Sequence, residues 1–259
     1  MKVAILAGGA GTRLAEETTV KPKPMVEIGG RPILWHIMKH YSHYGFDQFV
    51  IALGYKGEYI KKYVIDYSSL HSNLTVKIKN GDVRTHGVDH HPDWTVDLID
   101  TGQTTLTGGR IKRIEPYIDG ETFMVTYGDG VADIDISRLL ARHREMGKLA
   151  TVTGVRPMTR FGELEVADGL VAEFREKPQV KTGLINGGFF VFQREVFDYL
   201  TGDCSLEKEP LERLARDGQL AIYPHEGFWH CMDTYRDMES LNGLWASGKA
   251  PWKRSGDGE

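Results

Sequence analysis

The first stretch that could bind a ligand is a glycine-rich segment followed by basic residues. The apolar residues 3–7 lead straight into three glycines within residues 8–11, and the cations Arg13 and Lys23 follow. Glycine lets backbone N–H groups approach a ligand without interference from a Cβ atom, and successive N–H groups form a concave anion site. Arginine binds phosphate through forked hydrogen bonds and lysine binds it as a point charge. The pattern indicates a phosphate site, although the glycines alone fit a plain strand-to-helix turn equally well.

The spacing of these glycines excludes the two common nucleotide loops. A P-loop needs a lysine directly after its last glycine, in the pattern G-x-x-x-x-G-K-[ST], and no lysine stands there. The dinucleotide pattern G-x-G-x-x-G/A begins at Gly9 and Gly11 but meets Leu14 at its last position. The segment is therefore a third kind of phosphate loop.

A carboxylate stands at the end of a second apolar strand, because residues 122–127 are followed by Gly128-Asp129-Gly130. Ligands of open α/β sheets bind beyond the carboxyl ends of the strands, so we interpret Asp129 as a metal ligand rather than a turn residue. One carboxylate holds Mg²⁺ poorly, since Mg²⁺ prefers one or two carboxylates together with phosphate oxygens. The sequence shows no Ser-His-Asp arrangement, and its histidines form no H-E-x-x-H pattern.

Two motifs together carry a resemblance to a known family. The string L-A-G-G-x-G-T-R-L at residues 6–14, followed by K-P-K-P-M at residues 21–25, resembles the sugar-1-phosphate nucleotidylyltransferases. The agreement continues at residues 127–130, 176–178 and 186–190 and extends over nearly the whole chain. The resemblance implies a Rossmann-like nucleotide-diphospho-sugar transferase fold. It also implies a reaction in which a nucleoside triphosphate and a sugar 1-phosphate give a nucleotide sugar and pyrophosphate.

The family motifs imply roles for charged residues of this chain. Arg13 and Lys23 are the expected catalytic cations, because the attacking sugar phosphate is already an anion and needs charge neutralisation rather than a general base. Asp129 and Asp233 are the expected ligands of Mg²⁺. Without the resemblance, Asp233 would be interpreted as a helix N-cap, since a helix follows it.

The family motifs also imply binding residues for the two substrates. Glu176, Lys177 and Asn186 are expected to bind the sugar phosphate. Arg110 is expected to select the base, because a permanent donor fits the C2 carbonyl or ring nitrogen of cytosine. The expected nucleotide-binding residues are Leu6, Ala7, Gly8, Gly9, Ala10, Gly11, Thr12, Arg13, Lys23, Thr105, Arg110 and Gly128.

Within the family, residues 27–36, 100–110 and 227–230 look closest to the members that use CTP and glucose 1-phosphate. That likeness implies CDP-glucose and pyrophosphate as products. A uridylyl- or thymidylyltransferase acting on a sugar 1-phosphate is the alternative with the same chemistry. A non-catalytic nucleotide-sugar sensor is the alternative from another class, and the complete set of cationic and metal-binding residues argues against it.

The elements that must position these residues alternate between strand and helix along the chain. The alternation predicts a doubly wound α/β fold, with a mostly parallel sheet between helices and a smaller antiparallel substrate-side portion from residue 156 onward. We expect a single domain, with the nucleotide-binding core in residues 1–155 and the sugar-phosphate-binding portion and C-terminal helices in residues 156–259. Residues 10–22 show no helical periodicity and are expected to form a lid over the triphosphate.

The expected strands and helices follow from the apolar pattern and from turn residues. The expected strands are residues 3–7, 49–53, 74–79, 96–99, 122–127, 149–155, 162–166, 170–175 and 188–192. The expected helices are residues 33–44, 58–67, 107–117, 137–146, 209–216 and 233–244.

Composition limits the class of protein and its partners. The hydrophobic fraction of 41% is typical of a soluble domain, and a net charge of −4 gives no bulk attraction to nucleic acid, so we expect no nucleic-acid partner. The two cysteines, Cys204 and Cys231, form no C-x-x-C pattern and fit a reducing compartment. No apolar run approaches 18 residues or resembles a signal peptide, so we expect a cytoplasmic protein without membrane contact. The family resemblance adds the expectation of a homo-oligomer.

Overall fold

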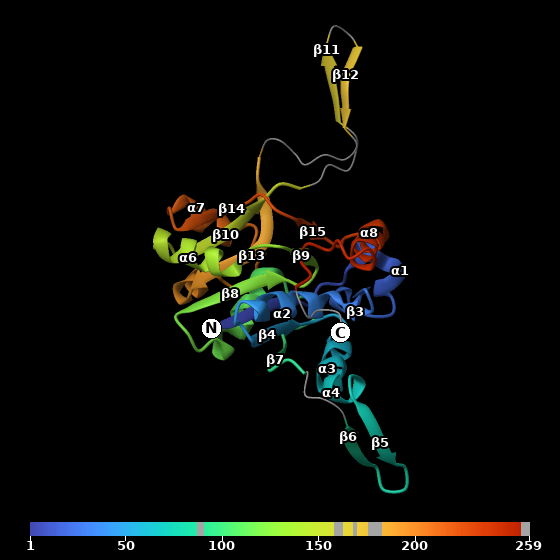
Figure 1. The fold of residues 1–259 in the computed structure, drawn as a ribbon. Coiled ribbons are helices and arrows are strands. Elements are labelled where there is room, and N and C mark those ends of the chain that lie inside the picture. Colours follow the sequence, from blue (N-terminus) through green and yellow to red (C-terminus); the bar gives the residue numbers. More distant parts are fainter. Residues whose placement is uncertain (87–90, 158–162, 168–169, 176–182, 255–259) are drawn as a thin grey trace.

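The centre of the molecule is a seven-stranded sheet (Figure 1) made of β1 (Lys2–Ala7), β4 (Gln48–Leu53), β7 (Thr95–Asp100), β8 (Thr122–Tyr127), β10 (Ala150–Val155), β13 (Ile185–Gln193) and β14 (Leu220–His225). The computed structural model of the protein describes residues 1–86, 91–157, 163–167, 170–175 and 183–254. The strand order is β14-β10-β13-β8-β1-β4-β7. Neighbouring strands are parallel except at β13, which runs antiparallel to β10 and β8. The expected mostly parallel sheet is confirmed.

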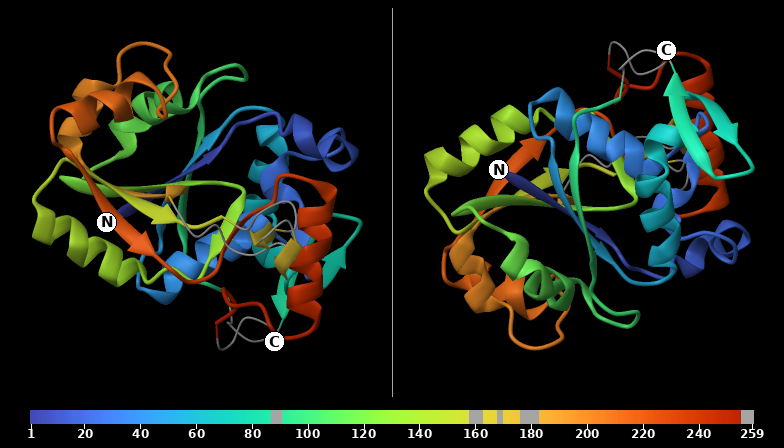
Figure 2. Two further views of the ribbon diagram at one scale, coloured as in Figure 1. Left: turned by 90° about the horizontal axis from the view of Figure 1, so that it is seen from above. Right: turned by 90° about the horizontal axis from the view of Figure 1, so that it is seen from below.

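Helices cover both faces of this sheet (Figure 2), because strand residues alternate between two apolar cores. In β1, Val3 and Ile5 belong to one core, whereas Ala4 and Leu6 belong to the other. All four side chains are buried. The first core includes residues of α2 (Ile33–His43) and α6 (Ile136–Met146), and the second includes residues of α5 (Thr107–Ile114) and α7 (Glu209–Arg216).

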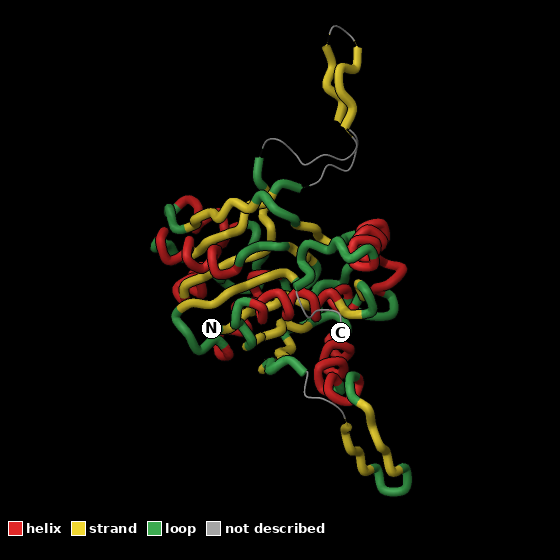
Figure 3. Tube along the Cα trace, viewed as in Figure 1, coloured by secondary structure: helices red, strands yellow, loops and turns green. Residues whose placement is uncertain are grey.

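The elements outside the sheet include two hairpins. α3 (Gly57–Ile65) and α4 (Tyr67–Leu70) lead into β5 (Asn73–Lys77) and β6 (Asp82–His86), a hairpin that projects from the body of the molecule (Figures 1 and 3). The second hairpin pairs β11 (Glu163–Ala167) with β12 (Leu170–Arg175). The remaining helices are η1 (Thr12–Leu14), α1 (Ala15–Thr18), η2 (Lys23–Met25), η3 (Glu115–Tyr117), η4 (Arg194–Tyr199) and α8 (Tyr235–Ala246).

Two very short ribbons complete the architecture. β2 (Glu27–Ile28) and β3 (Arg31–Pro32) pair across Gly29 and Gly30, whose φ angles of +59° and +77° suit a tight turn of two left-handed residues. β9 (Gly130–Ala132) pairs antiparallel with β15 (Trp229–Cys231). This second ribbon joins the segment after β8 to the segment before α8.

Most expected elements occur within a few residues of their expected bounds, and β8 and α7 occur at them. The strand β14 was not expected. This strand contains Pro224, which cannot donate to a strand ladder. The proline is tolerated because β14 forms an edge of the sheet. None of the helices in the described ranges is both long and apolar enough to span a membrane.

Candidate active site

The glycine loop after β1 opens a cleft beside the carboxyl ends of the parallel strands. A Cβ atom at Gly8 would lie 2.1 Å from Nη1 of Arg110, so a larger residue there would displace the Arg110 guanidinium. Gly11 has a φ of +62°, a conformation that favours glycine. Its carbonyl accepts hydrogen bonds from Leu14 N at 3.0 Å and from the Thr18 hydroxyl at 3.1 Å. The loop is thus tied to the residues that follow it by one backbone and one side-chain hydrogen bond.

The segment that follows the loop is partly helical, although its sequence shows no helical periodicity. Residues 12–18 form η1 and α1. Leu14 is fully buried, and the Thr18 hydroxyl donates to its carbonyl at 3.0 Å. The Tyr55 hydroxyl donates to the Thr18 carbonyl at 3.1 Å. Contacts with a distant residue stabilise these turns, and ordering of the segment over a ligand stays a prediction.

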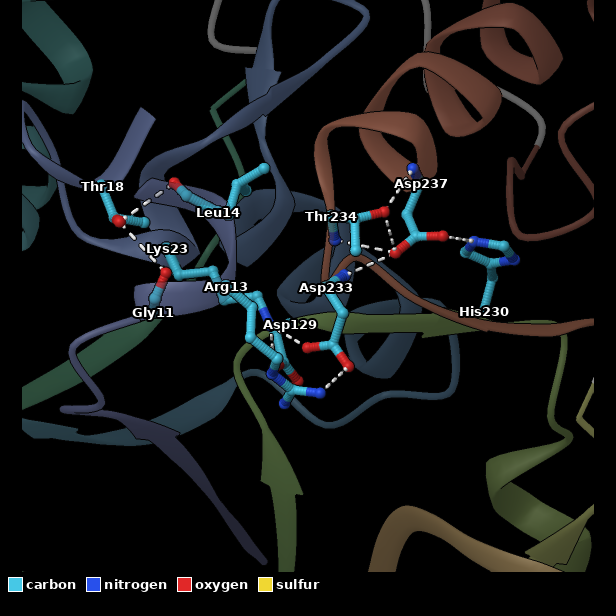
Figure 4. A network of polar contacts seen from close by, with 10 residues as sticks. All are labelled: Gly11, Arg13, Leu14, Thr18, Lys23, Asp129, His230, Asp233, Thr234 and Asp237. Atoms are coloured by element: carbon cyan, nitrogen blue, oxygen red, sulfur yellow. Dashed lines mark hydrogen bonds and ion pairs between the residues drawn. The ribbon is translucent and has the colours of Figure 1, made fainter. Parts of the chain in front are cut away.

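Lys23 lies at the centre of a charge network (Figure 4). Its side chain comes from η2 and is only 7% exposed. The ammonium nitrogen lies 2.7 Å from Oδ2 of Asp129 and 2.6 Å from Oδ1 of Asp233. Burial alone would lower the pKa of Lys23, but the two carboxylates raise it above its ordinary value. Lys23 is therefore a cation held between two acids.

Arg13 adds a second cation to the same network. Its Nη1 atom lies 2.7 Å from Oδ2 of Asp233, and its side chain is largely exposed. Burial tends to raise the pKa of Asp233, but hydrogen bonds and charge from Lys23, with the charge of Arg13, lower it below its usual value. The two cations that the sequence pointed to thus contact the same carboxylate.

The β9–β15 ribbon brings the two aspartates together although 104 residues separate them in the sequence. Cys231 pairs with Gly130 in the ribbon, and Met232 N donates to the Asp129 carbonyl at 2.8 Å. Asp129 and Asp233 flank this pairing on the two chain segments. Their carboxylates consequently converge on one point.

Asp237 fixes the backbone on which Asp233 stands. One oxygen, Oδ2, accepts from Asp233 N at 3.0 Å and from Thr234 N at 2.8 Å. In return, Asp237 N donates to the hydroxyl of Thr234, the N-cap of α8. Asp233 precedes this capping box rather than capping the helix. Its side chain points toward Arg13 and Lys23 (Figure 4).

The carboxylate pair fits a hard divalent cation. Oxygen atoms of Asp129 and Asp233 already converge on one cationic nitrogen, and Cys231 Sγ completes a group whose ligand atoms lie within 4.8 Å of one another. Burial, followed by the charge of Asp129, raises the pKa of the Cys231 thiol, which disfavours the thiolate that a soft metal needs. Two carboxylates suit an ion such as Mg²⁺ that takes oxygen ligands.

A cleft of about 680 Å³ surrounds this network. Ala10 is the expected site residue, among those described, that does not line the cleft, and Glu176 and Lys177 lie outside the described residues. Asp129, Asp233 and Asn186 share the cleft with the remaining expected nucleotide-binding residues: Leu6, Ala7, Gly8, Gly9, Gly11, Thr12, Arg13, Lys23, Thr105, Arg110 and Gly128.

Arg110 donates to the protein around the cleft, and its expected contact with a base stays a prediction. Its side chain is 4% exposed, and the two terminal nitrogens donate to a ring of acceptors that already uses their hydrogens. Nη2 donates to the carbonyls of Gly8 and Gln103 at 2.9 and 3.1 Å, and Nη1 donates to Leu53 O, Gly102 O and Thr101 Oγ1. The geometry favours support of the cleft backbone over direct contact with a base.

This geometry predicts the result of the substitution Arg110→Ala. We expect similar losses of kcat/KM with CTP and with UTP, and a lower melting temperature, because buried carbonyls left without a donor cost about 1–3 kcal/mol each. Lys112→Ala on the same helix is the control for activity, since its ammonium pairs with Glu115 and donates to Phe197 O away from the cleft. A loss of kcat/KM with CTP alone would support direct recognition of the base by Arg110.

The cleft also contains residues that sequence reasoning did not assign. Tyr127 lies two positions before Asp129, and Cys231 lies two positions before Asp233. Trp229 lies in the stretch 227–230 that resembles the family. The positions of these three residues in the sequence could therefore have indicated a place in the site. Glu207 carried no local signal, because it lies in a charged segment that resembles the start of a solvated helix. The Trp229 indole donates to Gly187 O at 2.7 Å, next to Asn186.

Comparisons with known proteins agree with the motifs and with the fold. The glucose-1-phosphate cytidylyltransferase of Salmonella typhimurium is 51% identical over 98% of this chain and 99% of its own length. The probable glucose-1-phosphate cytidylyltransferase of Bacillus subtilis is 48% identical, with the same coverage of both chains. The crystal structure of HddC from Yersinia pseudotuberculosis complexed with GMP-PN is similar with a TM-score of 0.69 and 25% identity, covering 94% of this chain and 99% of that one.

The family is shown by a match over most of the sequence. The sequence model of the nucleotidyl transferase family matches residues 2–231, a range that contains the glycine loop, Lys23 and Asp129. The chain therefore belongs to the nucleotidyl transferase family and is a nucleotidyltransferase.

Proposed function

We propose that the protein transfers a cytidylyl group from CTP to α-D-glucose 1-phosphate, giving CDP-glucose and pyrophosphate. The observation that carries the proposal is the 51% identity, over nearly the full length of both chains, to relatives named glucose-1-phosphate cytidylyltransferase. The convergence of Arg13, Lys23, Asp129 and Asp233 on one cleft supports a catalytic role over the sensor alternative.

In this proposal the protein positions two anions and neutralises their charge. A phosphate oxygen of the sugar phosphate attacks the α-phosphorus in line, and pyrophosphate leaves with the electron pair of the broken bond. The backbone of the glycine loop binds the triphosphate, and Arg13 and Lys23 offset the charge that concentrates around the α-phosphorus. No histidine is among the described residues of the cleft, and none is required, because the nucleophile is already an anion.

Mg²⁺ is the metal that we propose for Asp129 and Asp233, because both offer oxygen ligands and Mg²⁺ completes its shell with phosphate oxygens. When bound, the ion would supply positive charge to the triphosphate. Residues 1–155 would form the nucleotide-binding core, which includes the glycine loop and Arg110. Residues 156–259 would supply the sugar-phosphate residues Glu176, Lys177 and Asn186.

A homo-oligomer in the cytoplasm is also part of the proposal. The projecting β5–β6 hairpin exposes Leu74, Val76 and Val83, and a second copy of the chain could cover these apolar side chains. The two cysteines, Cys204 and Cys231, are free thiols, which suits a reducing compartment.

Pyrophosphate release with a panel of four triphosphates tests the proposed reaction. With glucose 1-phosphate and Mg²⁺ we expect CTP to be preferred over UTP, dTTP and GTP by about tenfold or more, because a mismatched base leaves buried polar groups unpaired. Reactions without sugar phosphate provide the background. Preference for UTP or dTTP would support the alternative with the same chemistry, and no release with any sugar phosphate would support the sensor.

A further inference from the structure

The Glu207 carboxylate joins β8 and α5, and it reaches β13 through the Tyr127 hydroxyl. Its Oε1 atom accepts from the Tyr127 hydroxyl of β8 at 2.6 Å. Its Oε2 atom accepts from Thr107 Oγ1, at the start of α5, and from Ser205 Oγ, both at 2.7 Å. The Tyr127 hydroxyl in turn accepts from Asn186 Nδ2 of β13 at 3.2 Å. All five residues line the cleft.

The segment that carries Glu207 is clamped onto the start of α5. Leu106 N donates to Asp203 Oδ1 at 2.8 Å, and Gly109 N donates to Cys204 O at 3.1 Å. A Cβ atom at Gly108 would lie 2.7 Å from Cys204 Sγ, so the two segments approach closely because residue 108 is glycine. Leu206, next to Glu207, is fully buried. These contacts hold the Glu207 carboxylate in one place.

The hydrogen-bond directions along this chain of contacts are fixed by the carboxylate. A carboxylate only accepts, so Tyr127 must donate to Glu207 and has only acceptor capacity left for Asn186. Asn186 Oδ1 accepts from Gly188 N at 2.8 Å, which turns its amide nitrogen toward Tyr127 and leaves one N–H without a partner among the residues that the structure describes. Burial tends to raise the pKa of Glu207, but the hydroxyl donors Tyr127, Thr107 and Ser205 lower it below its usual value.

The cleft contains charged groups of both signs. Arg13 and Lys23, which pair with Asp129 and Asp233, offer N–H donors to phosphate groups, whereas the Glu207 carboxylate would repel phosphate and suits neutral hydroxyl groups. On the basis of the proposed function, we infer that Glu207 is a positioning residue: through Tyr127 it holds Asn186 in the orientation that recognises hydroxyl groups of the sugar 1-phosphate.

The test separates the KM of each substrate from kcat. Glu207→Ala is expected to raise the KM for glucose 1-phosphate about tenfold, the order expected for a lost hydrogen bond to a charged group, with kcat and the KM for the triphosphate within about twofold. Glu207→Gln is expected to restore most of the affinity, because an amide oxygen still accepts from Tyr127. Tyr127→Phe should resemble Glu207→Ala, and the double variant should lose little more. Glu209→Gln, a nearby acid that does not line the described cleft, is the matched control.

A second readout uses the deoxy analogues of glucose 1-phosphate. The wild type should discriminate against at least one analogue, and Glu207→Ala should lose that discrimination. Equal increases of both KM values, a loss of kcat alone, or unchanged discrimination would overturn the positioning role and leave Glu207 as structural support. Wild-type turnover with CTP tests the proposed function separately, and the comparison of variants uses whichever triphosphate the wild type accepts.

Discussion

Asp129→Asn and Asp233→Asn are each expected to lower kcat/KM about a hundredfold to a thousandfold, the size of effect seen when one electrostatic group is removed from an active site. The two carboxylates converge on one point, so either substitution would remove half of the negative charge that holds the proposed ion. Because both would act on the same ion, kcat/KM of the double variant should be little lower than that of the less active single variant. The assay is steady-state kinetics over a range of Mg²⁺ concentrations.

Two further measurements make this result specific. Asp119→Asn is the matched control, because that carboxylate is 75% exposed and lies outside the described cleft. Circular dichroism should show that all variants remain folded, since neither aspartate belongs to the apolar cores. Losses that multiply in the double variant would mean that the two carboxylates act independently and would sink the shared-ion proposal.

The parts of the fold that sequence predicted are those with a strong local signal. The strands β1 and β8 are runs of apolar residues that end at glycine, and both lie at the centre of the sheet with their middle residues fully buried. The helix α7 begins with Pro210 in its first turn, where a missing N–H costs nothing, and this marks its start. Local chemistry decides such elements before any long-range contact forms.

The parts that sequence missed depend on distant partners. The ribbon β9–β15 has three residues on each side and pairs Gly130 with Cys231, so neither strand has a pattern of its own. The helical turns of residues 12–18 bury Leu14 and receive the Tyr55 hydroxyl, which a window of small and polar residues does not reveal. The strand β14 contains a proline and is a strand only because it lies at the sheet edge.

The candidate site divides in the same way. The glycine loop, Lys23 and Asp129 stand in motifs whose composition already indicates chemistry, and the structure places them in one cleft. Glu207 could not be found from its neighbours, because its role depends on Tyr127, which lies 80 residues earlier. The hydrogen bonds of the Arg110 guanidinium could not be predicted for the same reason, because their five acceptors come from segments far apart in the sequence.

Lys23→Met is expected to abolish most turnover and, at the same time, to strengthen the binding of Mn²⁺ in the absence of nucleotide. The ammonium nitrogen lies 2.7 Å from Asp129 and 2.6 Å from Asp233, which is where a divalent ion shared by these carboxylates would have to bind. Lysine and metal therefore compete for the same two oxygens. Methionine keeps an unbranched apolar stem without the charge, so it removes the competitor with little change in packing.

Binding and turnover should consequently move in opposite directions. We expect kcat/KM to fall about a hundredfold or more, because the triphosphate would lose a buried cation. We expect Mn²⁺ to bind more tightly, with a Kd about tenfold lower by electron paramagnetic resonance, the equivalent of about 1.4 kcal/mol. Lys21→Met is the control, since Lys21 pairs with Glu27 at 3.3 Å and not with Asp129 or Asp233. Weaker Mn²⁺ binding in Lys23→Met would show that the lysine holds the two carboxylates in place for the ion. Stronger binding would mean that Lys23 occupies the ion's position until the triphosphate draws it away.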